Sequence, residues 1–109
     1  MSDADLKKIA TKAKKPHRTT TTVTVITRDQ NVVAYVKRRA NGRCELCGEL
    51  APFEDTKGAP FLECHHVVWL ANDGLDSHEN AVALCPNCHR KMHVLARKAD
   101  VETLKKAAS

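Results

Sequence analysis

The sequence predicts a small α+β domain stabilised by zinc, with a helix ahead of it and a basic arm at its N-terminus. Three observations support this class. The chain has only 109 residues, it carries Cys-x-x-Cys pairs at residues 44–47 and 85–88, and short strand patterns alternate with helical ones. A domain of this size buries little apolar surface, so a metal ion or disulfide bonds usually supply the missing stability.

The first part of the chain predicts an arm followed by one helix. Residues 4–13 indicate a short basic helix or a disordered segment, and residues 19–27 are rich in β-branched side chains, which is typical of a strand. Thr27 or Asp29 can cap the following helix at its start, and Gly42 can cap its end. The apolar face of this helix is formed by Val32, Val33, Val36 and Ala40.

The remaining elements are short and follow each other closely. Gly58 and Pro60 interrupt any regular structure between the first cysteine pair and the next apolar run. Pro86 is well placed as the first residue of a helix. The expected order is a knuckle at residues 44–48, a loop at 52–60, a strand at 61–66, a turn at 72–74, a strand at 81–84, and helices at 86–98 and 101–107.

Charge is distributed unevenly along the chain. Residues 1–43 hold 11 Lys and Arg against 3 Asp and Glu, whereas residues 44–109 hold 7 against 10. A basic arm on a mildly acidic domain indicates either a polyanionic partner such as DNA or a solvated tail that aids solubility. No apolar run is long enough to span a membrane, and no signal peptide is evident, so we expect no membrane association and a cytoplasmic location.

Two cysteine pairs on separate segments predict one tetrahedral site. Four thiolates suit a structural Zn²⁺ ion, and the thiols of a cytoplasmic protein stay reduced. The alternative is a set of redox-active or incidental cysteines, although redox motifs rarely occur as such a pair. The expected ligands are Cys44, Cys47, Cys85 and Cys88, while Cys64 is expected in the core.

The histidines predict a second, open site. His89 and His93 lie four residues apart and share one face of a helix. His65 and His66 are neighbours on a strand and should therefore point to opposite faces. A closed cysteine site stabilises a fold, whereas an open site with two or three imidazoles leaves room for chemistry.

The same residues resemble the HNH endonucleases. The motif that carries the resemblance is formed by Glu63, Cys64, His65, His66, Val67, Leu70, Gly74, Asp76, Asn80, residues 84–89 and His93. Residues 38–48, with Ala51, Pro52 and Phe53, look like the nuclease domain of methylcytosine-dependent restriction endonucleases. The resemblance covers about residues 29–93 and leaves out residues 1–28.

This resemblance implies a ββα-metal fold, in which two antiparallel strands and a helix surround one divalent ion. His65 and His89 match the metal ligands of the family, and His93 matches a third histidine that is a ligand or a phosphate contact. Glu63 matches an acid that supports the ligands. The implied ion is Mn²⁺, Ni²⁺, Co²⁺, Zn²⁺ or Mg²⁺, and imidazole-rich sites suit the transition metals better than Mg²⁺.

The resemblance also assigns a base. His66 matches the general base that activates water. Asn80 matches the residue that braces the loop between the strands and orients this base. We expect Asn80 to orient His66 through a hydrogen bond between the two side chains. One departure is visible, because Leu75 follows Gly74 where the family often has a second glycine. Several basic side chains are candidate contacts to DNA phosphates or are simply solvated: Arg43, Arg90, Lys91 and Arg97.

The sequence therefore predicts two parts, a basic arm in residues 1–28 and an HNH nuclease domain in residues 29–109. The predicted activity is metal-dependent hydrolysis of phosphodiester bonds in DNA. The predicted role is the restriction of modified foreign DNA. The alternatives are a zinc-ribbon module that only binds nucleic acid and a phage-type nicking or packaging HNH nuclease. The intact histidines and Asn80 favour an enzyme over the zinc ribbon. No target-recognition module is evident, so we expect a homodimer or a separate module to supply specificity.

Overall fold

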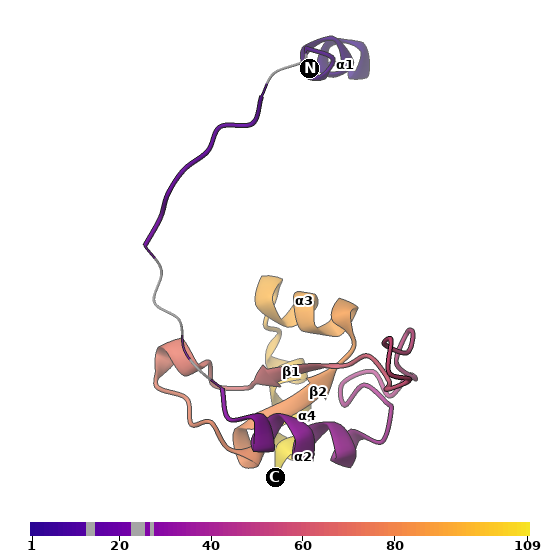
Figure 1. Ribbon diagram of the computed structural model, residues 1–109, viewed down its shortest axis with the longest axis vertical. Helices are drawn as coiled ribbons and strands as arrows, with labels where there is room; N and C mark the ends of the chain where they lie inside the picture. The colour runs from indigo at the N-terminus through magenta and orange to yellow at the C-terminus, as the bar shows by residue number, and fades with distance from the viewer. Residues whose placement is uncertain (13–14, 23–25, 27) are drawn as a thin grey trace.

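An antiparallel hairpin of two short strands lies at the centre of the fold, between helices (Figure 1). In the computed structural model, which describes residues 1–12, 15–22, 26 and 28–109, strand β1 (Glu63–His66) pairs with strand β2 (Ala81–Leu84), with Glu63 opposite Leu84. This small α+β arrangement confirms the predicted class.

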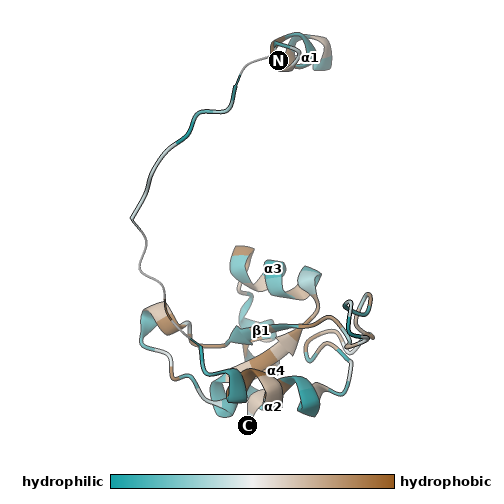
Figure 2. Cartoon of the chain, viewed as in Figure 1, coloured by the Kyte–Doolittle hydropathy of each residue, from teal (hydrophilic) through white to brown (hydrophobic). Residues whose placement is uncertain are grey.

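The two strands differ sharply in polarity. In Figure 2, β2 has hydrophobic colours and β1 has hydrophilic ones. All residues of β2 are buried, and because side chains alternate along a strand, Val82 and Leu84 enter one apolar cluster while Ala81 and Ala83 enter another. The hairpin thus has an apolar strand that anchors it and a polar strand that can carry functional groups.

Helix α2 (Gln30–Ala40) covers one face of the hairpin. Its fully buried Val36 packs there, and the partly buried Val32, Val33 and Ala40 support it, as the predicted apolar face requires. Cys64 is buried in this same cluster, which confirms it as a core residue. The cluster consists of Val36, Leu62, Cys64, Ala81 and Ala83.

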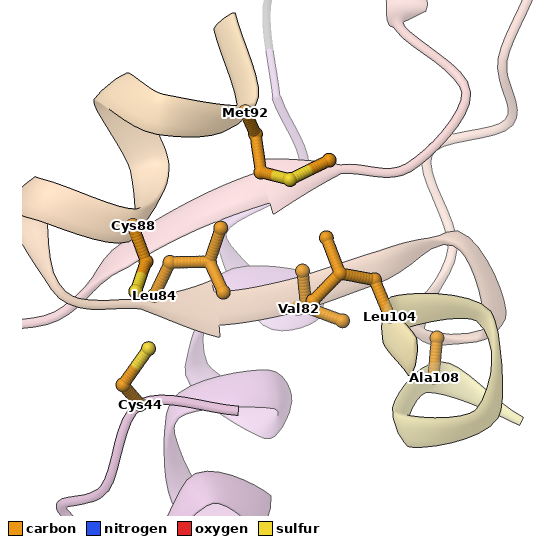
Figure 3. Packing of buried hydrophobic residues seen from close by; sticks show 7 residues of the cluster. All are labelled: Cys44, Val82, Leu84, Cys88, Met92, Leu104 and Ala108. Carbon is orange, nitrogen blue, oxygen red and sulfur yellow. The ribbon is translucent and has the colours of Figure 1, made fainter. Parts of the chain in front are cut away.

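Helices α3 (Pro86–Val94) and α4 (Lys98–Ala108) contribute to the cluster on the other face, which Figure 3 shows. Met92 comes from α3, and the fully buried Leu104 comes from α4. The buried residues of this cluster are Cys44, Val82, Leu84, Cys88, Met92, Leu104 and Ala108. Because two cysteines of the predicted metal site belong to it, this cluster and that site are continuous.

The outer edge of β2 is closed by the cysteine knuckle. The amide of Glu45 donates to the carbonyl of Ala83 (2.9 Å), and the Glu45 carboxylate accepts from the Ala83 amide (2.9 Å). Arg39 of α2 pairs with the same carboxylate through both Nε and Nη2, at 3.0 and 2.9 Å, and donates to the carbonyl of Ala81. This bidentate pair fixes α2, the knuckle and β2 relative to one another.

The ends of α2 differ in part from the prediction. Asp29 is the N-cap, because its side chain accepts from the amide of Asn31, whereas Thr27 lies outside the described residues. The C-cap is Asn41 (φ 51°) and not Gly42. Asparagine tolerates the left-handed conformation, and the Asn41 amide donates to the Arg38 carbonyl. Gly42 (φ 82°) then continues the turn.

Helix α3 starts at Pro86 as predicted, but it ends at Val94 instead of continuing to about residue 98. Ala96 adopts φ 46°, which breaks the helix and turns the chain into α4. Strand β1 is also shorter than the predicted 61–66, because the Phe61 amide donates to the Phe53 carbonyl of the preceding loop. The predicted turn at 72–74 is present, with Asp73 at φ 63°.

The N-terminal arm begins with helix α1 (Asp3–Ala10), which Ser2 and Asp5 cap reciprocally. No residue of α1 is buried. Most of the predicted strand at 19–27 lies outside the described residues, and Thr19–Thr22 and Ile26 carry no regular structure. Within the described part of the chain, no helix is long and apolar enough to cross a membrane.

Candidate active site and metal centre

The four predicted cysteines converge as expected. Their sulfur atoms all lie within 4.8 Å of one another. Cys44 and Cys47 come from the knuckle after α2, and Cys85 and Cys88 come from the start of α3. The amides of Leu46 and Cys88 donate to the Cys44 and Cys85 sulfurs, each at 3.4 Å. The set is therefore positioned to bind a metal ion, and Cys64 is not part of it.

The pKa values of these thiols shift in different directions. Burial raises the pKa of the Cys44 thiol, but backbone hydrogen bonds outweigh it and bring this pKa to about 7. Burial raises the pKa of Cys47 and of Cys88, and neighbouring thiols raise that of Cys88 further. Four thiolates repel one another in this space, so their joint ionisation requires a positive ion between them.

Three predicted histidines form the second cluster. His65 of β1 meets His89 and His93 of α3, and nitrogen atoms of the three rings lie within 4.8 Å of one another. His65 is only 3% exposed, and burial, followed by the charges of His89 and His93, lowers its pKa to about 4. Burial also lowers the pKa of His93. The lowered pKa values keep His65 and His93 neutral at neutral pH, which is the form that binds metals.

The donor set fits a divalent ion. Nδ1 of His89 lies 2.9 Å from Oε1 of Glu63, as expected for a carboxylate that supports a ligand. Because an ionised carboxylate only accepts hydrogen bonds, this contact places the His89 proton on Nδ1 and leaves Nε2 with a lone pair. That Nε2 lies 3.1 Å from Nε2 of His93. Two ring nitrogens that approach each other so closely, beside a third, can share a cation.

His66 lies in a different environment from its neighbour. Its Nε2 lies 2.8 Å from Oδ1 of Asp76, while Oδ2 of Asp76 accepts from the amide of Asp29. The Asp29 amide, followed by His66, lowers the pKa of Asp76, so this carboxylate is ionised and acts as the acceptor. The proton of His66 is therefore on Nε2, and Nδ1 is free to accept another.

Both adjacent histidines nevertheless line one pocket of about 340 Å³. His89 and His93 complete its polar wall, and Trp69 forms part of its apolar wall. The Trp69 ring packs on His93 with 4.9 Å between ring centroids. His66 and the three-histidine cluster thus open onto the same space.

Asn80 braces the loop between the strands, as the resemblance implies. Its side chain accepts from the Val68 amide and donates to the carbonyls of Val68 and Leu75, each at 2.9 Å. The expected bond from Asn80 to His66 is absent among the described residues, because Asp76 occupies that position instead. Asn80 can therefore orient His66 only through the loop that carries Asp76.

The same loop requires Gly74. A Cβ atom at this position would lie 1.8 Å from the Val68 carbonyl oxygen, so any other residue would force the backbone to move. The neighbouring Leu75 is 74% exposed. Leu75, which stands where the family often has a second glycine, therefore fits in the loop because its side chain points into solvent.

The predicted DNA contacts are scattered. Arg90 is exposed and lines a hollow together with His89 and His93. Lys91 points towards Asp100 of α4 (3.7 Å), Arg43 donates to the Gly48 carbonyl beside the cysteine knuckle, and Arg97 is the first residue before α4. Of these four predicted DNA contacts, Arg90 lines a hollow together with histidines of the cluster.

Two residues at the site were not assigned from the sequence. Asp76 belongs to the motif, but its contact with His66 depends on a loop conformation that sequence spacing does not define. Arg28 lines the histidine pocket, although the sequence prediction placed it in the basic arm, residues 1–28.

Comparisons with known proteins agree with this geometry. The family model described as HNH endonuclease matches residues 44–94. The Type IV methyl-directed restriction enzyme EcoKMcrA of Escherichia coli (strain K12) is 49% identical over 69 residues, which cover 63% of this chain and 25% of that enzyme.

Solved structures give the same result. The Type IV phosphorothioation-dependent restriction endonuclease ScoMcrA matches with a TM-score of 0.65 and 32% identity, over 74% of this chain and 17% of that one. The modification dependent TagI restriction endonuclease matches with a TM-score of 0.52 and 29% identity, over 61% of this chain and 23% of that one.

The chain thus spans a quarter or less of the length of these three proteins. The family match, at residues 44–94, spans the segment that carries both metal-type clusters and His66. Residues 44–94 therefore belong to the HNH endonuclease family, and the chain is homologous to Type IV modification-dependent restriction enzymes.

Proposed function

We propose that this chain is a metal-dependent DNA endonuclease that hydrolyses phosphodiester bonds in modified foreign DNA. The observation that supports this most directly is the common pocket of His66 and the histidine cluster. Hydrolysis of a phosphodiester requires a base for water and positive charge near the phosphate, and this pocket offers groups for both.

In this proposal, His65, His89 and His93 hold a divalent ion. When bound, the ion supplies positive charge that stabilises the additional negative charge on the phosphate and on the leaving oxygen. Glu63 keeps the proton of His89 on Nδ1 and so keeps Nε2 available. Three imidazole ligands suit Mn²⁺, Co²⁺, Ni²⁺ or Zn²⁺ better than Mg²⁺.

His66 acts as the general base. Its Nδ1 accepts a proton from water, the water oxygen forms a bond to phosphorus, and the bond from phosphorus to the 3′ oxygen breaks. Asp76 stabilises the positive charge that His66 gains, and it fixes the orientation of the ring through the 2.8 Å contact. Asn80 positions Asp76 through the loop that it braces.

The cysteine cluster holds Zn²⁺ in a structural role. Four sulfur ligands close a tetrahedral site and leave no position for substrate. Two of the four cysteines are also part of the buried cluster beneath α3 and α4, so the ion and the core support each other. Reduced thiols in this arrangement suit a cytoplasmic protein, which is where we place the enzyme.

We propose that another module or a second copy of the chain recognises the target DNA. The names of the relatives describe one as methyl-directed, one as phosphorothioation-dependent and one as modification dependent. The direct test is cleavage of modified and unmodified duplexes of the same sequence with several divalent ions. DNA binding without any cleavage would favour the zinc-ribbon alternative, and single-strand nicks alone would favour a nicking nuclease.

The first prediction concerns the cysteine site. Cys44→Ser should remove one tightly held zinc per chain and unfold the domain, because so small a core depends on its metal. Metal analysis and thermal unfolding monitored by circular dichroism measure this. Cys64→Ala is the matched control and should keep its zinc, since Cys64 lies outside the cluster. A well-folded, zinc-free Cys44→Ser protein would contradict the structural role.

The second prediction concerns the base. His66→Ala should lower the single-turnover cleavage rate by about 10²–10⁴-fold, the usual contribution of a general base, while metal content and DNA affinity stay near wild type. Asp76→Asn should lower the rate by less, since the ring remains. His17→Ala, which removes an exposed imidazole, is the control. Cleavage by His66→Ala at the wild-type rate would exclude His66 as the base.

The third prediction concerns the second metal. His65→Ala and His89→Ala should lose the weaker ion but retain zinc, as measured by calorimetric titration with Mn²⁺ or Co²⁺ and by metal analysis. Wild-type activity with these ions should equal or exceed that with Mg²⁺. If both variants still bind the second ion with wild-type affinity, the site lies elsewhere.

The fourth prediction concerns the arm, which we propose to be residues 1–28, with residues 29–109 as the nuclease domain. Deleting residues 1–22 removes six basic and two acidic side chains. Binding should weaken, and the slope of log affinity against log salt should fall by about 0.9 for each lost phosphate contact. The rate at saturating DNA should be retained. An unchanged salt slope would show that the arm does not contact DNA.

A further inference from the structure

We propose that Arg28 is a further catalytic residue, whose guanidinium contacts the phosphate that is cleaved in the histidine pocket. This inference rests on the proposed nuclease function. It also moves Arg28 from the basic arm, where its sequence position placed it, into the active site.

Arg28 and the residue after it contact the site at two points. Nη1 of Arg28 donates to the carbonyl of Cys64 in β1, at 3.3 Å. The following residue, Asp29, caps α2 and donates its amide to the Asp76 carboxylate that holds His66. Arg28 is thus tied to the strand that carries both adjacent histidines and to the loop that supports the base.

The side chain faces the same space as the proposed base and metal ligands. Arg28 lines the pocket together with His65, His66, His89 and His93. It is the one Lys or Arg among the described residues that lines this pocket. Arg90 lies at a neighbouring hollow, Lys91 points towards Asp100, and Arg43 donates to the Gly48 carbonyl.

Arg28 forms no salt bridge among the described residues, although it lies near enough to Asp76 to contribute to the lowered pKa of that carboxyl. No Asp or Glu oxygen of the described residues lies within 4.0 Å of its guanidinium, whereas Arg39 on the nearby helix is paired with Glu45. A guanidinium has five N–H donors, and the bond to Cys64 uses one of them. The remaining donors can bind two oxygens of a phosphate, a geometry that guanidinium matches well.

The apolar wall of the pocket strengthens this interaction. Ile26, Trp69 and Leu70 line the pocket beside Arg28. Arg28 is itself exposed, so a phosphate can reach its guanidinium, and a phosphate seated against these apolar side chains would be partly shielded from water, which increases its attraction to a fixed cation. Because the phosphate gains negative charge as water attacks, a cation fixed beforehand at this place favours the transition state over the ground state.

The test compares three substitutions in the full chain. Arg28→Ala removes both the charge and the N–H donors. Arg28→Gln keeps N–H donors for the Cys64 carbonyl but removes the charge. Arg28→Lys keeps the charge but loses the planar pair of donors that binds two phosphate oxygens. Arg38→Ala removes one exposed arginine of α2 and serves as the control. For each protein we would measure single-turnover cleavage at saturating DNA, second-metal content and thermal stability. DNA affinity would be measured on the zinc-loaded protein without the second metal.

Arg28→Ala and Arg28→Gln should cleave about 10²–10³-fold more slowly than wild type, as is typical when one preorganised contact to developing charge is lost. Arg28→Lys should retain part of the activity, about tenfold below wild type, because a point charge replaces the planar fork. The Arg28 variants should retain both metals and the thermal stability of wild type. Their DNA affinity without the second metal should weaken only a few-fold. Arg38→Ala should match wild type in every measurement.

The opposite outcomes are distinct. If Arg28→Gln cleaves like wild type while Arg28→Ala is slow, Arg28 has only a structural role through Cys64, and the proposal is wrong. It is also wrong if the rate falls only together with metal content or stability, or if all three variants cleave normally. If the wild-type protein itself does not cleave DNA with any divalent ion, the proposed function fails first, and the inference about Arg28 fails with it.

Discussion

The alternation of side chains along β1 is the constraint on which the site depends. Two neighbouring residues of a strand point to opposite faces, so His65 and His66 enter different environments although they are adjacent in sequence. His65 joins the imidazoles of α3, and His66 meets Asp76 of the loop. A shift of the strand register by one residue would exchange the two histidines and abolish both environments. The fold therefore has to hold this register firmly.

That register is held mainly by β2 and its supports. β2 is buried on both faces, so a slip would move alanines and larger residues between clusters of different size. The pair of Glu45 and Arg39 closes the edge of β2 that β1 does not occupy. Because Glu45 lies between two metal-site cysteines, ordering of the knuckle by an ion and ordering of the strand edge reinforce each other.

Much of this arrangement could be predicted from the sequence, because the decisive patterns are local. The spacing of the cysteines, the separation of His89 and His93 by one helical turn, and the apolar run of β2 each identify their element and the face that it presents. The order of the elements and the grouping of both clusters follow from these patterns together with the family resemblance.

The features that could not be predicted depend on loop conformation. The partner of His66 is Asp76 and not Asn80, because the loop that Asn80 braces places the carboxylate within reach of the ring. The end of α3 depends on the positive φ of Ala96, a conformation that alanine rarely adopts and that no local pattern indicates. Arg28 was predicted to belong to the basic arm, since nothing in its spacing indicates a contact with Cys64.

Asp76 connects helix capping to the proposed chemistry. One of its oxygens accepts from the amide of Asp29 at the start of α2, and the other contacts His66. The start of α2, Arg28 immediately before it and the proposed base are therefore linked through one carboxylate. A disturbance at the N-terminal end of α2 would reach the ring of His66 through this single side chain, without any change in β1. The helix packed on the hairpin thus does more than form the core, because the residue that caps it also binds the carboxylate in contact with His66.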